Sequence, residues 1–184
     1  VDGVDVRDMT QKELRDKLGY VPQKGVLFSG TIDSNIRYGK PEITDAQVKE
    51  AAEVAQATEF IDTKPEKYES PVSQGGTNVS GGQKQRLSIA RAIAKDPEIF
   101  IFDDSFSALD FKTDSQLRKA LKEYTKDATT VIVAQRISTI LGADQIIVLD
   151  DGHMAGIGTH KELMANCEVY QQIARSQLSE EELA

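Results

Sequence analysis

The sequence predicts an α/β fold with a parallel sheet at its core, because strand and helix patterns alternate along its second half. Residues 99–102, Ile-Phe-Ile-Phe, form a continuous apolar run that is typical of a parallel strand buried on both faces. Helical patterns precede this run at 82–95 and follow it at 113–126. Two further runs, 129–134 and 145–149, predict buried strands, which right-handed crossovers would place in the same parallel sheet.

Helix starts are marked by capping boxes, in which Ser or Thr is followed three residues later by Glu or Gln. The box at Thr10 predicts a short helix that ends near Gly19 and leads into a brief strand over 20–23. The box at Thr44 begins a helix with an apolar face. The box at Thr159 begins a pair of terminal helices.

Weaker patterns complete the description of the chain. Residues 31–38 are expected to be irregular or one helical turn, and residues 137–141 predict a short helix. Asp151-Gly152 is a turn signal. The acidic residues after Ser179 are expected to fray.

Three segments follow from these patterns. Residues 1–43 are a partial α/β core, and residues 97–184 continue that core and add the terminal helices. Residues 44–96 are predicted to be a helical subdomain without a strand of its own. This subdomain contains the connection 64–78, whose length favours a functional role.

Bulk composition limits the possible functions. Apolar residues make up 39% and charged residues 28%, so one domain with a sizeable core is expected. The net charge of −8 argues against nucleic-acid binding, which needs a basic surface. The single cysteine, Cys167, excludes an internal disulfide. No apolar run approaches the ~20 residues that cross a bilayer. We interpret the opening Val1 as the start of a fragment.

The most informative stretch is residues 78–86, Asn-Val-Ser-Gly-Gly-Gln-Lys-Gln-Arg. Ser80 would cap a helix whose first N–H groups favour an anion, and two glycines would let a phosphate approach closely. The four residues 80–83, Ser-Gly-Gly-Gln, also fit an ordinary capping box, which is the more frequent meaning of this pattern. The helical continuation to residue 92 and the strand behind it favour the phosphate site.

Asp103 ends the apolar strand, at the edge where parallel sheets bind ligands. A carboxylate there can hold Mg²⁺ directly or through water, although an Asp can also cap the following helix. Neither His153 nor His160 lies in a metal-binding spacing, so surface positions are expected for both.

These motifs together resemble those of ATP-binding-cassette (ABC) proteins over nearly the whole chain. The resemblance implies a RecA-like sheet core, ATP and Mg²⁺ as ligands, and a second nucleotide-binding domain as partner. It implies that Ser80, Gly81, Gly82 and Gln83, the signature residues of the family, grip ATP held by the partner. It also implies that residues 107–110 cross to that partner. The implied nucleotide-binding residues are Gln23, Ser80, Gly81, Gly82, Gln83, Asp103 and Asp110, with Gln23 and Asp103 at the metal.

The match is closest to exporter-type ABC transporters. Residues 28–36, 73–78 and 158–163 resemble exporter segments. Residues 73–78 correspond to a loop that contacts the membrane domains. The resemblance therefore implies transmembrane domains as partners and a position on the cytoplasmic face of the cell membrane.

Two positions depart from the family pattern, and both are positions where the family has catalytic residues. Asp104 stands where the family has the Glu that polarises the attacking water, and Asp is one methylene shorter. Gln135 stands where the family has a histidine, and an amide cannot be protonated near neutral pH. The pair indicates a degenerate catalytic site, as in heterodimeric exporters with one degenerate and one competent site.

One family motif is absent: no G-x-x-x-x-G-K-[ST] phosphate loop occurs in the 184 residues. Three hypotheses follow. The chain is the ATPase domain of a heterodimeric exporter, inactive on its own. Alternatively, it is a regulatory module that binds nucleotide without hydrolysing it. The third hypothesis is a truncated fragment that exposes apolar surface and self-associates.

Overall fold

The computed structural model describes residues 1–179, and the fraying expected after Ser179 lies outside the described residues. The chain divides into two compact units, the first from Val1 to Val133 and the second from Ala134 onward. Each unit has its own apolar core. The three segments predicted from the sequence remain a prediction, and the whole of 44–96 belongs to the first unit.

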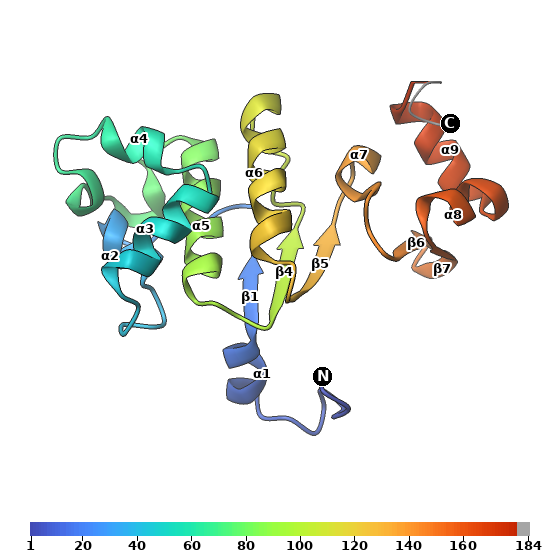
Figure 1. Cartoon of the computed structure of the whole chain (residues 1–184), viewed down its shortest axis with the longest axis horizontal. Coiled ribbons are helices and arrows are strands. Elements are labelled where there is room, and N and C mark those ends of the chain that lie inside the picture. The colour runs from blue at the N-terminus through green and yellow to red at the C-terminus, as the bar shows by residue number, and fades with distance from the viewer. Residues whose placement is uncertain (180–184) are drawn as a thin grey trace. The chain divides into compact units, whose positions relative to one another are not determined.

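The first unit is built on a parallel sheet of three strands (Figure 1). The strands are β1 (Leu18–Val21), β4 (Ile99–Asp103) and β5 (Thr129–Val133), in the order β1-β4-β5. Both pairings are parallel, with Tyr20 opposite Ile101. The predicted α/β class is confirmed.

Two helices cover one face of this sheet, α5 (Gly81–Ala94) and α6 (Phe111–Tyr124). Phe100 and Phe102 point into that contact and are 2% and 1% exposed. The prediction that β4 is buried on both faces is wrong for the described residues, because Ile101 on the other face is only partly buried.

The prediction of a buried strand over 129–134 is also wrong in the described part of the chain. Val131 is 46% exposed and Val133 is 53% exposed. The physical reasons are the position of β5 at the end of the described sheet, with only β4 beside it, and the place of Val131 and Val133 on the face of Ile101, which α5 and α6 do not cover. An apolar, β-branched run predicts a strand but does not show how many neighbours the strand has.

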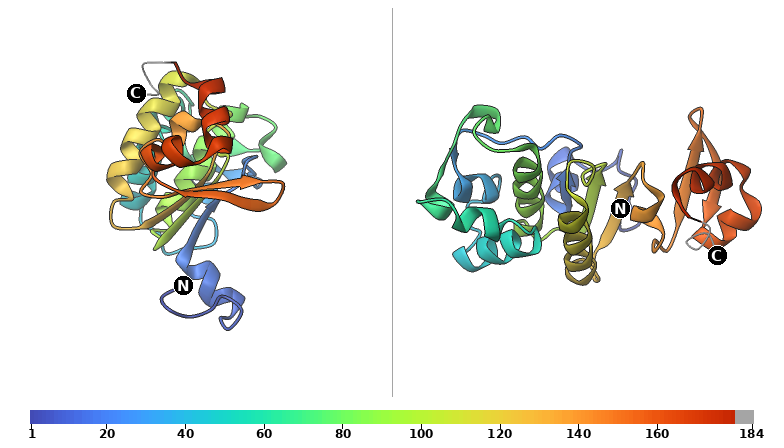
Figure 2. Two further views of the ribbon diagram at one scale, coloured as in Figure 1. Left: turned by 90° about the vertical axis from the view of Figure 1, so that its right-hand side faces the viewer. Right: turned by 90° about the horizontal axis from the view of Figure 1, so that it is seen from above.

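A group of helices gathers beside the β1 edge, around α5 (Figures 1 and 2). It consists of α2 (Ile32–Ile36), α3 (Asp45–Val54) and α4 (Thr58–Asp62). The single helical turn allowed for residues 31–38 is confirmed as α2.

The prediction that residues 44–96 have no strand of their own is wrong. Strand β3 (Pro71–Val72) pairs antiparallel with β2 (Gly30–Thr31), between the 3-10 turns η1 (Lys67–Glu69) and η2 (Gln74–Gly76). The Asn78 side chain closes this segment by donating to the carbonyl of Pro71 at 2.8 Å. A two-residue strand is too short to leave a period in the sequence.

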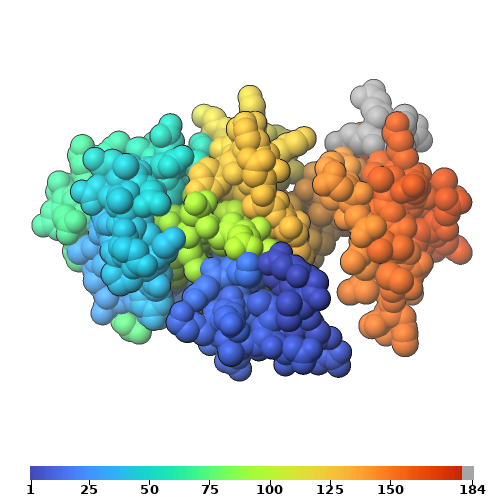
Figure 3. Space-filling view, turned by 60° about the horizontal axis from the view of Figure 1, so that its bottom comes forward, coloured from blue at the N-terminus to red at the C-terminus, as the bar shows by residue number. Residues whose placement is uncertain are grey.

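Helix α1 (Gln11–Lys17) and the residues before it form a bulge on the surface of the first unit (Figure 3). None of the α1 residues is buried. The capping boxes predicted at Thr10, Thr44 and Thr159 are all confirmed, so local side-chain hydrogen bonds fix these helix starts.

The second unit packs two strands against two helices. Its elements are α7 (Ile137–Ile140), β6 (Ile146–Asp150), β7 (His153–Gly158), α8 (His160–Asn166) and α9 (Glu168–Gln177). Strand β6 pairs antiparallel with β7 rather than within the parallel sheet, which corrects the prediction for 145–149. Asp151 and Gly152 take positive φ and make the predicted turn.

The core of the second unit lies under one face of the hairpin. Val148 and Tyr170 are 5% and 1% exposed, whereas Ile147 and Leu149 on the other face are 58% and 66% exposed. The Tyr170 hydroxyl lies 2.8 Å from Nδ1 of His160, which joins α8 to α9. Within residues 1–179, no helix combines the length and the apolar character that a membrane span requires.

Candidate nucleotide-binding site

The carboxyl ends of the three parallel strands are tied together at one edge of the sheet. Asp104 takes a left-handed φ of 44° directly after β4, and its N–H donates to the Val133 carbonyl at 2.8 Å. The buried Ser105 hydroxyl donates to the carbonyl of Val21 at 2.8 Å. Asp103 and Asp104 therefore stand at the edge where open α/β sheets bind ligands.

The Asp103 carboxylate has a partner that the sequence analysis missed. The Tyr20 hydroxyl donates to Oδ2 of Asp103 at 3.0 Å. This hydrogen bond, helped by partial burial and the carboxylate charge, raises the pKa of the Tyr20 phenol. The parallel register could have indicated it, because Tyr20 lies opposite Ile101, two residues before Asp103 on the same face.

Gln23 reaches the neighbouring carboxylate. Its Nε2 donates to Oδ2 of Asp104 at 3.0 Å. The structure thus joins Gln23 to Asp104, the residue that follows Asp103, and the assignment of Gln23 and Asp103 to Mg²⁺ stays a prediction.

The donor chemistry of these residues suits Mg²⁺. Among residues 1–179, no group of three or more His, Cys, Asp or Glu could hold a metal ion alone. Mg²⁺ is usually held by one or two carboxylates together with waters and substrate phosphates rather than by a protein cage. Asp103 with the Gln23 carboxamide is a donor set of that kind.

The signature residues begin α5 as a complete capping box. The Gln83 N–H donates to Oγ of Ser80 at 3.2 Å, and the Ser80 N–H donates to Oε1 of Gln83 at 3.1 Å. A side chain at Gly81 would meet nothing within 4 Å, whereas one at Gly82 would lie 3.5 Å from the carbonyl oxygen of Ala108. The local capping interpretation is therefore confirmed, and the open space at Gly81 leaves room for an anion.

Asp110 has a structural role that the sequence analysis did not consider. It is the N-cap of α6 and accepts hydrogen bonds from the N–H and the hydroxyl of Thr113, at 3.0 and 2.7 Å. The Thr113 backbone bond is the main cause that lowers the pKa of Asp110. Nucleotide binding by Asp110 remains a prediction beside this observed role.

Gln135 lies in the second unit, between the end of β5 and the start of α7. Its backbone carbonyl accepts a hydrogen bond from Nε2 of Gln177 at 2.9 Å, and the Gln177 Oε1 accepts one from the N–H of Ile137. Helix α9 thus fixes the backbone at Gln135 within its own unit.

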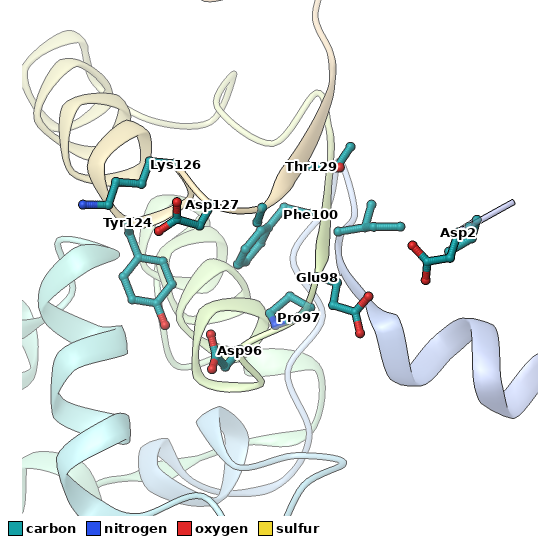
Figure 4. Close-up of a pocket in the computed structure, with 12 residues that line it drawn as sticks. Asp2, Asp96, Pro97, Glu98, Phe100, Tyr124, Lys126, Asp127 and Thr129 are labelled. Carbon is teal, nitrogen blue, oxygen red and sulfur yellow. The ribbon is translucent and has the colours of Figure 1, made fainter.

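A hollow at the opposite, amino-terminal edge of the sheet does not suit a nucleotide (Figure 4). It is lined by the first residues of β4 and by the end of α6. Its lining side chains include four carboxylates and one lysine. The charged lining residues are Asp2, Asp96, Glu98, Lys126 and Asp127. Because this lining would repel phosphates, the carboxyl edge remains the better candidate site.

Comparison with known proteins agrees with the motifs. The ABC transporter family matches residues 1–107, and the chain belongs to this family. It is 47% identical over 180 residues to an ABC transporter ATP-binding protein of Mycobacterium bovis, covering 96% of this chain and 31% of the relative. It is 44% identical over 173 residues to a Staphylococcus aureus protein named as a multidrug export ATP-binding/permease protein, covering 94% and 30%.

The structure of a bacterial Atm1-family ABC exporter with ATP bound superposes with a TM-score of 0.92 and 40% identity. The match covers 97% of this chain and 32% of that exporter chain. The chain therefore spans about a third of the length of the relatives that it matches.

Proposed function

We propose that this chain is the ATP-binding domain of an ABC exporter and couples ATP binding and hydrolysis to transport across a membrane. One observation carries the proposal: Gln23 and Asp104 are hydrogen-bonded beside Asp103 at the carboxyl edge of the sheet, and Ser80 caps α5 within the same unit. The names of the matched relatives support the exporter assignment.

In this proposal two such domains sandwich ATP. Asp103 and Gln23 hold the metal on this chain's own nucleotide, and bound Mg²⁺ neutralises charge on the phosphates. The signature residues Ser80, Gly81, Gly82 and Gln83 serve ATP on the partner domain, where the N–H groups of α5 stabilise phosphate charge.

The partner would contact the segment after Asp104. Asp110 precedes Phe111, whose side chain is 84% exposed. An aromatic ring so exposed at the start of a helix is more stable when another surface covers it. The other proposed partners are transmembrane domains, which would place the chain on the cytoplasmic face of the cell membrane. Nucleic acid remains excluded from the proposed partners because of the net charge of −8.

We propose further that the chain's own half-site is degenerate and that its partner is a different subunit. Asp104 carries a shorter carboxylate than Glu and is held by Gln23. Gln135 cannot be protonated near neutral pH, unlike the histidine that the family has at this position. The near-standard signature at Ser80–Gln83 would complete a competent site on the partner.

The phosphate loop of this chain's own site would come from residues outside these 184, since no such loop occurs in the sequence. A calorimetric titration of ATP and Mg²⁺ tests this assignment. Binding should require a version of the chain extended upstream through that loop. Comparable binding by the 184 residues alone would contradict it.

Gly82→Ala tests the signature assignment. A methyl at Gly82 makes only ordinary contacts, so the variant should fold, but it would crowd a phosphate. ATPase activity of the full-length pair should fall by about tenfold or more. Gly142→Ala is the matched control, because a methyl there meets nothing within 4 Å and Gly142 is not among the proposed nucleotide-binding residues. Unchanged activity in Gly82→Ala would refute the assignment.

A second candidate is a regulatory module that binds nucleotide without hydrolysing it. The Asp104–Gln23 hydrogen bond favours this alternative, because it occupies the carboxylate at the position of the catalytic base. Asp104→Glu combined with Gln135→His should then raise turnover at this half-site in the full-length pair. The same turnover in the double variant would count against a degenerate site.

A third candidate, a fragment that self-associates, is favoured by the exposed apolar side chains Val131, Val133, Ile147 and Leu149. Light scattering of the 184-residue chain should then show a mass above that of one chain and rising with concentration. A clean monomer would argue against this candidate.

A further inference from the structure

Gln85 is a buried polar residue near the start of α5, and its side chain is bonded to a loop rather than to its own helix. It is 1% exposed. Its Nε2 donates to the Pro22 carbonyl at 3.0 Å, and its Oε1 accepts from the Gly25 N–H at 2.9 Å. The amide therefore holds the backbone on both sides of Gln23, and we name this contact the Gln85 clamp.

Gly25 lets the loop approach α5 closely enough for this contact. A Cβ at Gly25 would lie 2.8 Å from Oγ of Ser88 and 2.9 Å from the carbonyl oxygen of Lys84. Both distances are too short for a side chain, so the loop backbone rests directly on the helix. The clamp thus joins the loop to α5 without an intervening side chain at Gly25.

The other end of the loop is fixed independently. The Ser105 hydroxyl, which belongs to the residue after Asp104, donates to the carbonyl of Val21. Gln23 is therefore held between the end of β1 and the clamp on α5. From this position its amide reaches Oδ2 of Asp104.

We propose that Gln85 is a positioning residue, which transmits the placement of the signature helix α5 to Gln23 and through it to the metal side of the nucleotide site. The inference rests on the proposed ATP-binding function. Its physical basis is that α5 begins at Gly81, four residues before Gln85, and such a segment moves as one rigid element. A shift at the signature must then shift Pro22 and Gly25 together, with Gln23 between them.

The first test measures the clamp itself. Gln85→Met keeps a similar volume and removes both hydrogen bonds. Amide hydrogen exchange of Gly25, followed by NMR on ¹⁵N-labelled protein, should accelerate by about fivefold or more. The amides of Leu87 and Ile89 in the same helix should be unchanged. An unchanged Gly25 rate overturns the clamp.

Ser88→Ala is the matched control on the same face of α5. Ser88 is 3% exposed, and its hydroxyl has no hydrogen-bond partner among the described residues. Ser88→Ala should leave the amide exchange rate of Gly25 and ATP binding unchanged.

Gln85→Glu keeps an acceptor for the Gly25 N–H but loses the donor to Pro22. It should keep Gly25 protected while weakening Mg²⁺-dependent ATP binding, and it serves if Gln85→Met does not fold.

The second test separates positioning from general packing with a double-mutant cycle in the full-length pair. Gln23→Ala and Gln85→Met should each weaken Mg²⁺-dependent ATP binding by about fivefold, and ATP binding without Mg²⁺ should not change. The double variant should lose no more than either single variant, because both act through the same contact. Additive losses of ATP affinity, or equal losses with and without Mg²⁺, would show that Gln85 only contributes to packing and does not position Gln23.

The two proposals fail in different ways. No effect of Gln23→Ala refutes the metal role of Gln23 in the proposed function and, with it, the positioning role of Gln85. A clear effect of Gln23→Ala with none from Gln85→Met refutes the positioning role alone.

Discussion

Helices α5 and α6 have the same length, 14 residues, and pack on the same face of the sheet, yet they bury different side chains. Helix α6 contributes the apolar Leu117 and Leu121, together with Asp114, which pairs with Arg118 of its own helix at 2.9 Å. Helix α5 also has an apolar face, but it directs Gln85 to the loop after β1, and Arg91 to Val26 and to Asn35 of α2.

The Arg91 guanidinium shows what this difference means. It donates to the carbonyl of Asn35 at 2.8 Å, to the carbonyl of Val26 at 2.9 Å and to Oδ1 of Asn35 at 3.0 Å. It also lies over the rings of Phe28 and Tyr38, at 5.3 and 5.5 Å. Burial lowers the pKa of Arg91, but these acceptors keep the charge satisfied.

Together, Gln85 and Arg91 fasten the chain from Pro22 to Asn35 onto α5. The comparison teaches that α6 stabilises the sheet, whereas α5 stabilises the sheet and also positions the loop that carries Gln23. Damage to α6 should therefore reduce stability alone, and damage to α5 should change loop geometry as well.

Arg91→Met should have the largest effect. It removes the three hydrogen bonds and leaves the carbonyl of the buried Asn35 without its donor, which should cost about 4 kcal/mol in the free energy of unfolding measured in urea. Arg91→Lys keeps the charge but not the planar fork, so it should recover less than half of the loss. Full recovery by lysine would show that charge alone matters at this position.

Leu117→Ala should destabilise the protein nearly as much, by about 3 kcal/mol, because the side chain is fully buried and its removal leaves a cavity. Its effect on the α5 loop should be absent. Amide exchange of Gly25 under strongly native conditions is the measurement. Faster exchange at Gly25 would contradict the division of roles between the two helices.

Ser80→Ala should cost about 1 kcal/mol through loss of the α5 cap, whereas Ser80→Gly should cost only a few tenths. The pair separates the two interpretations of Ser80. If the hydroxyl only caps the helix, Ser80→Gly should leave the ATPase activity of the full-length pair unchanged. If it also contacts nucleotide, as proposed, both variants should lose activity to a similar extent.

Asp110→Asn should have the smallest effect, and one that depends on pH. The pKa of Asp110 is lowered in the folded state, so its stabilisation is present above the unfolded value of about 4 and is lost as pH falls through the folded pKa. Asn keeps the cap without the charge. The difference in unfolding midpoint between wild type and Asp110→Asn should therefore shrink below about pH 4. A difference that is constant with pH would contradict the carboxylate as its source.

Much of this fold could be predicted because it is encoded by local interactions. The capping boxes at Thr10, Thr44, Ser80 and Thr159 involve side chains only three residues apart, so their pattern is visible in the sequence. The apolar run of β4 is also a local pattern, because its four residues are consecutive in the sequence. The placement of Asp103 at the carboxyl edge followed from the strand that it ends.

Other features could not be predicted because they depend on which segments meet. The short β2–β3 pair, the antiparallel β6–β7 hairpin and the exposure of β5 are properties of neighbours rather than of sequence period. The Gln85 contact could be predicted in part. Its position heads a row with Ser88, Ile89 and Ala92 that is buried throughout, which could have indicated a buried amide but not its partners.

The sequence by itself determined the α/β class, the helix starts and the chemical types of residue at the candidate site, since these follow from periodicity and short-range hydrogen bonds. Only the tertiary structure decided that Tyr20 bonds to Asp103 and that Gln23 bonds to Asp104. It also decided that Gln85 holds the loop that carries Gln23. Each of these contacts joins residues separated by 60 or more positions. Such contacts form only when packing of the strands and of α5 brings the two segments together, which no local pattern specifies.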